Sequence, residues 1–210
     1  MGQPLHAALW DRAAELAERC VRHPFVEGLG DGTLTEEIFK RYVAQDAYFL
    51  RAYLSAYALC AARAHDREAA ALLVELQQGT LGELVLHAGY ARRLEIDLAG
   101  VRPYRAAAAY CDFLLRTAWH ETLDRMLAAM TPCMRLYSHL GTELARRGGS
   151  ERRYGDWVKT YSGEEFGRLV GRLESLLDRV AEDTPAVEEH YLYALSCEND
   201  FFTASLEGGP

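Results

Sequence analysis

An aspartate stands in the middle of an aromatic, apolar stretch of the chain, YVAQDAYFL at residues 42–50. At helical spacing Asp46 shares a face with Tyr42, Phe49 and Tyr53, so we expect its carboxylate to lie among aromatic rings. Burial would raise the pKa of such a carboxyl unless a partner donates to it. Two interpretations follow from the residues alone. Asp46 pairs with one of the many arginines, or it holds a ligand with an amidine-like face through two parallel hydrogen bonds.

A cysteine follows a proline inside a predicted helix, in the segment TPCMRLY at residues 131–137. A proline within a helix removes a backbone hydrogen bond and bends the axis, as is common where a helix lines a cavity. Cys133 then shares a face with Tyr137, one turn later. Only the thiolate is a nucleophile, so Cys133 is a candidate nucleophile that needs help from its site. Cys20 and Cys60 are expected to be inert core residues.

A glutamate lies near the end of the chain in YALSCENDFF, with Phe201 about one turn later and Tyr191 two turns earlier. Glu198 is a candidate general acid and base if burial raises its pKa toward neutrality. The alternative is an ordinary solvated carboxylate. Tyr110 and Tyr161 also stand in apolar helical segments, where a packing role is the alternative to a functional one.

Glu83 and His87 are four residues apart, which invites a metal interpretation. Di-iron helix bundles use a Glu-x-x-His spacing of three, twice, with two further glutamates. The sequence has one pair at the wrong spacing and no second pair. We therefore expect Glu83 and His87 to pair with each other or to brace a neighbouring helix.

Apolar residues at spacings of three and four recur along the chain, and no segment alternates with the period of a strand. The sequence predicts one all-α domain, residues 1–210, of about seven helices. The loop GLGDG at 28–32 separates the first helix from the second, which Thr33 or Thr35 caps. Pro132 interrupts the helix at about 121–147. Thr184 and Pro185 start the last helix. The expected helices are 4–22, about 35–64, 66–96, 106–119, 121–147, 153–182 and 186–206.

Composition excludes several classes of function. The 210 residues carry a formal charge of -8, which argues against a nucleic-acid partner, because phosphates need a basic surface. No run of eighteen apolar residues predicts a membrane span, and acidic residues near the start argue against a secretory signal. Five cysteines without a CxxC pair indicate reduced thiols in a cytoplasmic protein.

The segment HPFVEGLGDGTLTEEIFKRYVAQDAYFL at residues 23–50 resembles the opening of the TenA family, the thiaminase II or aminopyrimidine aminohydrolase proteins. The resemblance continues through ELVLH, AYCDFLL, TPCMRLY, WVKTYSGEEF and ENDFF. It implies a haem-oxygenase-like helical bundle. It also implies site roles: a nucleophile, an acid/base, an aspartate that grips the pyrimidine ring nitrogen and amine, and aromatic residues of the pocket. By this resemblance the nucleophile is Cys133, the acid/base is Glu198, and the aspartate is Asp46. The aromatic residues of the pocket are Phe49, Tyr110, Tyr137, Tyr161 and Phe201.

The family activity that the resemblance implies is hydrolysis of the C–N bond at the methylene of a 4-amino-2-methylpyrimidine. The substrate is a salvaged aminomethyl-aminopyrimidine or thiamin, and salvage is favoured. Cys133 adds covalently to the ring, Glu198 moves the protons, and Phe49 and Phe201 sandwich the ring. No metal or organic cofactor is implied, and the assembly is a homotetramer. Many members have Tyr where this chain has Phe49, and Trp where it has Phe202.

Two other functions on the same fold stay open at this point. One is a non-catalytic pyrimidine-binding or regulatory protein, against which the presence of Cys133, Asp46 and Glu198 together speaks. The other is a redox or di-iron enzyme, which bound iron would reveal.

Overall fold

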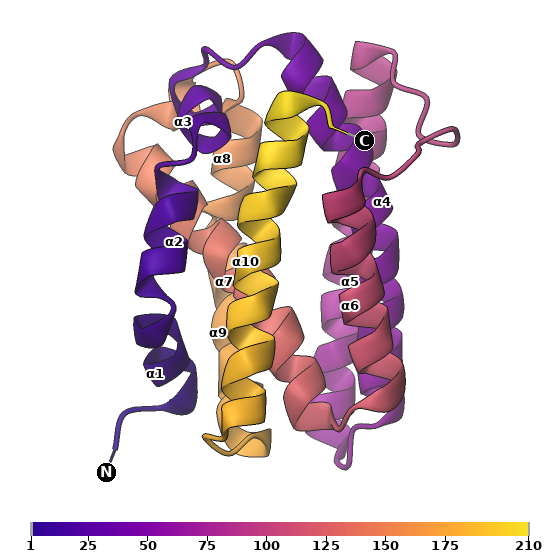
Figure 1. Cartoon of the computed structure of the whole chain (residues 1–210), viewed down its shortest axis with the longest axis vertical. Coiled ribbons are helices and arrows are strands. Elements are labelled where there is room, and N and C mark those ends of the chain that lie inside the picture. Colours follow the sequence, from indigo (N-terminus) through magenta and orange to yellow (C-terminus); the bar gives the residue numbers. More distant parts are fainter. Residues whose placement is uncertain (1, 210) are drawn as a thin grey trace.

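The computed structural model describes residues 2–209, in which the regular structure is entirely helical (Figure 1). The prediction of an all-α chain is confirmed, but the number of helices is larger than seven. Within the described residues there are ten α-helices and one 3-10 helix: α1 Leu5–Arg12, α2 Ala14–Val21, α3 Pro24–Asp31, α4 Glu36–Ala62, α5 Arg67–Leu94, α6 Arg105–His120, α7 Leu123–Arg146, η1 Gly149–Glu151, α8 Gly155–Tyr161, α9 Glu164–Val180 and α10 Pro185–Glu207.

Side chains at the helix starts explain why the long helices begin where the sequence predicts. The hydroxyl of Thr35 accepts a hydrogen bond from the backbone N–H of Ile38 at the start of α4. Asp66 does the same for α5, at 2.7 Å from the Ala69 nitrogen. Thr184 caps α10, and Pro185 occupies its first turn. Each cap satisfies an N–H group that has no partner inside the helix.

The extra helices come from three places where the predicted boundaries are wrong. Residues 4–22 form α1 and α2, because the backbone at Ala13 (φ -88°, ψ 0°) breaks the regular helix. Residues 28–31 of the GLGDG segment are helical and belong to α3. This helix starts at Pro24, where the His23 ring accepts a hydrogen bond from the backbone N–H of Phe25. It ends at Gly32, whose φ is 81°. A helical Gly30 suits this position, since a Cβ there would collide with the side chain of Leu144.

The third correction concerns residues 153–182, which form α8 and α9 with a break at Ser162 and Gly163. This break packs directly on α7. A Cβ at Gly141 would lie 2.5 Å from the Tyr161 carbonyl carbon and 2.7 Å from the Ser162 nitrogen. The glycine therefore allows the two backbones to approach, and this fixes the position of Tyr161 at the end of α8.

Pro132 does not divide α7, which continues from Leu123 to Arg146 with the proline inside it. A neighbouring helix supports the backbone on the turn before the proline, because the Tyr53 hydroxyl donates to the Met130 carbonyl at 2.7 Å. Cys133 therefore lies inside a continuous helix, one residue after a missing N–H donor.

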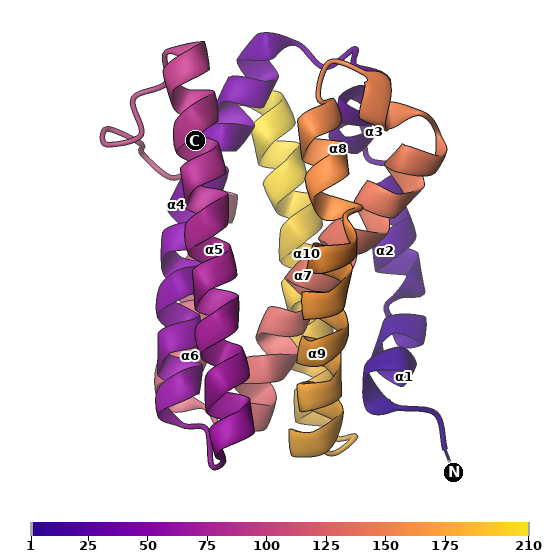
Figure 2. The same ribbon diagram turned by 180° about the vertical axis from the view of Figure 1, so that it is seen from behind.

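The helices run roughly along the long axis of the molecule in two neighbouring groups. The helices α4, α5 and α6 lie side by side on one side, and α7, α9 and α10 form the other, with α1 and α2 at the outside (Figures 1 and 2). The space between the two groups is filled by a continuous core rich in aromatic side chains, to which all the long helices contribute. Such a core brings side chains from several helices close together between the two groups.

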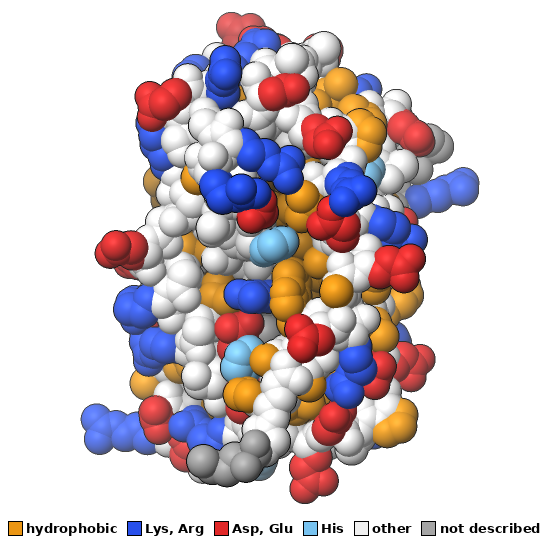
Figure 3. Space-filling model, turned by 90° about the vertical axis from the view of Figure 1, so that its left-hand side faces the viewer, with side chains coloured by type: hydrophobic (Ala, Val, Ile, Leu, Met, Phe, Trp, Pro, Cys, Tyr) orange, Lys and Arg blue, Asp and Glu red, His pale blue; other side chains and the backbone are white. Residues whose placement is uncertain are grey.

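No helix within residues 2–209 is both long enough and apolar enough to cross a membrane. On the side of the molecule that Figure 3 shows, acidic and basic side chains are interspersed and form no continuous basic surface.

Candidate active site

The eight side chains predicted for the site come from five helices and lie buried between the two groups of helices. Ring contacts link them in two sets. Phe49 lies 4.8 Å from Tyr110 and 6.2 Å from Phe201 between ring centroids, and Tyr137 lies 4.9 Å from Tyr161. By helix, they are Asp46 and Phe49 on α4, Tyr110 on α6, Cys133 and Tyr137 on α7, Tyr161 on α8, and Glu198 and Phe201 on α10.

The Glu198 side chain is only 2% exposed, so it is not a solvated carboxylate. The Tyr110 hydroxyl donates to its Oε1 at 2.9 Å. Burial raises the pKa of Glu198 to about 8, and hydrogen bonds from Tyr110 and Cys133 oppose this shift only in part. Glu198 is therefore mostly protonated at neutral pH and titrates in the range that suits a general acid and base.

Cys133 faces this carboxyl from α7. Burial, followed by the charge of Glu198, holds the pKa of the Cys133 thiol well above its ordinary value. The thiol is thus protonated, and its reactivity depends on a base that takes the proton. Glu198, whose charge is the largest influence on this thiol after burial, is such a base in its ionised form.

Asp46 has a histidine as its partner, not the arginine that the sequence suggested. Its Oδ2 lies 2.7 Å from Nε2 of His87, and both residues are buried. The two residues belong to α4 and α5, so His87 braces a neighbouring helix, which was one of the two alternatives for it. The other ring nitrogen, Nδ1, lies 2.9 Å from the backbone carbonyl oxygen of Glu83.

The side chains of Glu83 and His87 do not pair with each other in a hydrogen bond. Oε2 of Glu83 instead accepts from the Tyr161 hydroxyl at 3.1 Å. Burial raises the pKa of Glu83 to about 7, with a further contribution from the charge of Asp46. Within the described part of the chain, no group of three or more His, Cys, Asp and Glu side chains is arranged to hold a metal ion.

The two phenylalanines expected to sandwich a pyrimidine ring are not parallel in this structure. Their planes make an angle of 59°. A flat ring between two parallel rings needs a centroid separation of about 7 Å, twice a carbon contact distance of about 3.5 Å, compared with 6.2 Å between Phe49 and Phe201. Phe49 stacks instead on Tyr53, at 5.3 Å and 25°. A sandwich therefore requires one ring to turn when a ligand enters.

Several residues of the centre were missing from the predicted set. The Trp157 ring nitrogen donates to the Tyr42 hydroxyl at 3.1 Å, and the Tyr57 hydroxyl donates to that of Tyr53 at 3.1 Å. Glu83 and His87 were weighed as metal ligands and expected to pair with each other or to brace a neighbouring helix, and were not assigned to the site. The four-residue spacing of Glu83 and His87 in ELVLH could have indicated that both side chains belong to the site, because it places them on one face of α5.

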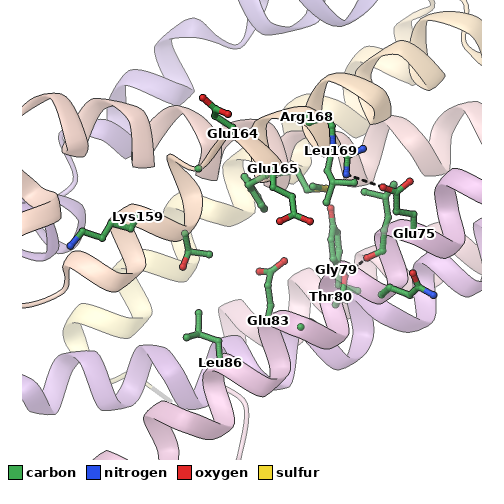
Figure 4. A pocket seen from close by; sticks show the side chains of 18 residues that line it. Glu75, Gly79, Thr80, Glu83, Leu86, Lys159, Glu164, Glu165, Arg168 and Leu169 are labelled. Carbon is green, nitrogen blue, oxygen red and sulfur yellow. Dashed lines mark hydrogen bonds and ion pairs between the residues drawn. The ribbon is translucent and has the colours of Figure 1, made fainter.

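An open cavity of about 740 Å³ adjoins this centre between α5 and the α8–α9 segment. Cys133 and Glu198 do not line it, but Glu83, Tyr53 and Met134 do. In Figure 4, Glu83 from α5 and Glu165 from α9 point toward each other across the cavity. Glu83 therefore belongs both to the cavity wall and, through Tyr161, to the buried centre, as Tyr53 does through its stacking on Phe49.

Comparison with known proteins shows the family of this chain. The pattern of the TENA/THI-4/PQQC family matches residues 10–208. This chain belongs to that family. An aminopyrimidine aminohydrolase of Halalkalibacterium halodurans is similar to this TenA-family chain, with 31% identity over 207 residues that cover 93% of the chain and 92% of the relative.

Solved structures resemble the TenA-family chain along its whole length. A TenA homologue from P. horikoshii OT3 has a TM-score of 0.91 and 26% identity, and the match covers 99% of this chain and 100% of that one. A domain from Shewanella denitrificans OS217 with a heme oxygenase-like fold has a TM-score of 0.78 at 11% identity, covering 96% and 92% of the two chains. The expected fold and family are thereby confirmed.

Proposed function

We propose that this chain is a hydrolase of the aminopyrimidine aminohydrolase, or thiaminase II, type. It cleaves the C–N bond at the methylene of a 4-amino-2-methylpyrimidine, in aminomethyl-aminopyrimidine salvage and in thiamin hydrolysis. The observation that carries the proposal is the buried Cys133 thiol beside the Glu198 carboxyl, in the same buried centre as Asp46. The name of the similar Halalkalibacterium halodurans protein supports the same reaction.

The first half of the reaction uses the ionised form of Glu198. This carboxylate takes the proton of the Cys133 thiol, and the thiolate electron pair forms an S–C bond to a ring carbon. A pair of ring π electrons then forms a C=C bond to the exocyclic carbon as its C–N bond breaks. The leaving nitrogen keeps the bonding pair and, when it leaves as an amine, takes the proton from Glu198. A thiazole leaves as the neutral molecule and needs no proton, so in that case Glu198 releases its proton to solvent before water adds.

The second half returns the enzyme to its starting state. Water adds to the exocyclic carbon and passes a proton to Glu198. The electron pair of that double bond re-forms the aromatic ring, the C–S bond breaks, and the thiolate regains a proton from Glu198. The net change replaces the amine by a hydroxyl group. Asp46 fixes the ring throughout, and the Tyr110 hydroxyl holds Glu198 in place.

Product analysis of variants tests the proposal. Hydroxymethylpyrimidine release is measured from 4-amino-5-aminomethyl-2-methylpyrimidine and, separately, from thiamin. Cys133→Ala is expected to abolish release while leaving pyrimidine binding largely intact. Cys60→Ala is the matched control, because Cys60 is also a buried thiol but its Sγ donates to the Met130 sulfur in the core. A wild type that binds the pyrimidine and turns over neither compound would support a binding protein instead.

We further propose a homotetramer in the cytoplasm, as the family resemblance implies. Sedimentation velocity of the purified chain tests the assembly, and a monomer at micromolar concentration would contradict it.

A further inference from the structure

Both ring nitrogens of His87 are engaged, and this determines how many protons the ring shares with Asp46. Nδ1 lies 2.9 Å from the Glu83 backbone oxygen, which only accepts hydrogen bonds, so Nδ1 carries a hydrogen. Nε2 lies 2.7 Å from Oδ2 of Asp46, a distance that requires one proton between them. The pair is therefore either an imidazolium with a carboxylate, or a neutral imidazole with a carboxylic acid.

The surroundings favour the first arrangement. Burial lowers the pKa of His87, but the charge of Asp46 and the hydrogen bond to it outweigh burial, so the net shift is upward. Within residues 2–209, the ion pair with His87 is the only one that Asp46 makes. The other titratable groups close enough to feel the Asp46 charge bring no positive charge: Tyr42 on α4, Glu83 on α5, Cys111 on α6, Cys133 and Tyr137 on α7, Tyr161 on α8 and Glu198 on α10.

An ionised Asp46 presents two acceptor oxygens and no donor. The amidine-like face of a neutral 4-aminopyrimidine has one donor, the amine, and one acceptor, the ring nitrogen. Two acceptors do not match this face, whereas they match a ring-protonated aminopyrimidine, which presents two N–H donors. The charge state of the pair thus decides which form of the ligand fits.

We propose that the Asp46–His87 pair selects the aminopyrimidine in its ring-protonated form, and that His87 is the positioning residue that imposes this choice by keeping Asp46 ionised. The inference rests on the proposed function and adds the protonation state of its substrate. It also gives His87 a part in the chemistry. As the thiolate electron pair forms the S–C bond, ring π electrons move toward the protonated nitrogen and neutralise its charge, which makes the ring a better electrophile.

The test uses the unreactive probe 4-amino-2,5-dimethylpyrimidine, which has no leaving group. Its ultraviolet spectrum differs between the neutral and the ring-protonated forms. We expect the bound probe to keep the protonated spectrum at a pH where the free probe is neutral. Its affinity for the wild type is expected to fall by about tenfold per pH unit above the pKa of the free probe, because the protonated fraction falls by that factor.

Two variants distinguish a role of the Asp46–His87 pair in setting the charge of the bound ring from a role in packing alone. Asp46→Asn offers one donor and one acceptor, which match the neutral ring, so the bound probe should show the neutral spectrum. His87→Gln keeps an N–H donor without a charge, so Asp46 should become protonated, the bound spectrum should become neutral, and kcat should fall by about tenfold or more with a smaller change in KM. His190→Gln is the matched control, since Nδ1 of His190 also bonds a carbonyl four residues earlier.

A neutral spectrum of the probe in the wild type, or a His87→Gln variant that behaves like the wild type, overturns this inference. If turnover still depends on Cys133 in that case, the proposed function stands and only the protonation state is wrong. If the wild type does not bind the probe at all, both the inference and the proposed function fail.

Discussion

The Tyr110 hydroxyl on α6 donates a 2.9 Å hydrogen bond to Glu198 on α10, and Cys133 on α7 shares that carboxyl. Three helices thus place one acid/base group between a fixed donor and a candidate nucleophile. Because Tyr110 stabilises the ionised form, it lowers the pKa of Glu198 against the effect of burial, which raises it to about 8. This relationship makes the rate sensitive to pH and to the hydroxyl of Tyr110.

Tyr110→Phe removes this hydrogen bond and leaves the ring in place. We expect kcat to rise with pH through an apparent pKa near 8 in the wild type, because the reaction starts from ionised Glu198. In the variant this limb moves to higher pH, and kcat at neutral pH falls by about tenfold or more. The measurement is the pH profile of kcat. Tyr48→Phe, on the outer part of α4, serves as the control, and an unmoved limb in Tyr110→Phe would count against the assignment.

Glu198 also makes stability depend on pH. Its carboxyl titrates near 4.5 when solvated and near 8 in the folded chain. Between these pH values the unfolded state has released the proton that the folded state retains, so this group's contribution to stability is present below 4.5 and is lost as pH rises through 8. Glu198→Gln should abolish turnover.

The same variant should melt at an increasingly higher temperature than the wild type as pH rises from about 5 to about 8.5, and each kcal/mol corresponds to about 2–4 °C for a chain of this size. Thermal unfolding followed by circular dichroism checks this trend. Glu143→Gln is the control: a hydrogen bond from Arg146 lowers the pKa of Glu143, so this carboxyl is ionised in both states across the range and its variant should show no such trend. A constant difference between Glu198→Gln and wild type would show that Glu198 is ionised in the folded chain.

Asp46→Ala breaks a buried pair and leaves the His87 ring without its partner. Removing one member of such a pair costs about 3–5 kcal/mol, and the ligand loses its two hydrogen bonds at the same time. We expect a lower free energy of unfolding, weaker binding of the pyrimidine probe, and a fall in kcat/KM. Urea unfolding and calorimetric titration measure the two effects separately. Unchanged binding would remove Asp46 from the ligand site.

Gly141→Ala tests how helix packing positions the centre. The added Cβ would lie 2.5 Å from the Tyr161 carbonyl carbon, so the α8–α9 segment has to shift. Such overpacking costs about 1–3 kcal/mol. Because Tyr161 hydrogen-bonds Glu83 at 3.1 Å, turnover should fall together with stability. Gly171→Ala, inside α9 where a Cβ meets nothing within 4 Å, should leave turnover unchanged and should not lower stability.

The sequence predicted the parts of the fold that local chemistry decides. Thr35, Asp66 and Thr184 were readable as helix starts, because each accepts an N–H within its own first turn. The α3 helix was not readable, since its Gly30 is explained by the approach of Leu144, more than a hundred residues away in the chain. The break between α8 and α9 depends in the same way on Gly141.

In the site, too, some features follow from local sequence and others only from the packing of helices. Burial of Asp46 was predictable from its apolar surroundings, whereas the sequence left Glu198 as either a buried or a solvated carboxylate, and the structure buries it. The partner of Asp46 was not predictable, because His87 reaches it only through the packing of α5 on α4. The protonated state of Glu198 at neutral pH likewise depends on burial and on Tyr110, which the one-dimensional pattern does not place.

Covalent attachment of the pyrimidine to Cys133 is the central claim, and intact-protein mass spectrometry after an acid quench during turnover tests it most directly. The account predicts a mass increase equal to the methylene-pyrimidine fragment in the wild type and in Cys60→Ala, and none in Cys133→Ala. Hydrolysis that continues in Cys133→Ala, or an adduct that persists there, would contradict the account.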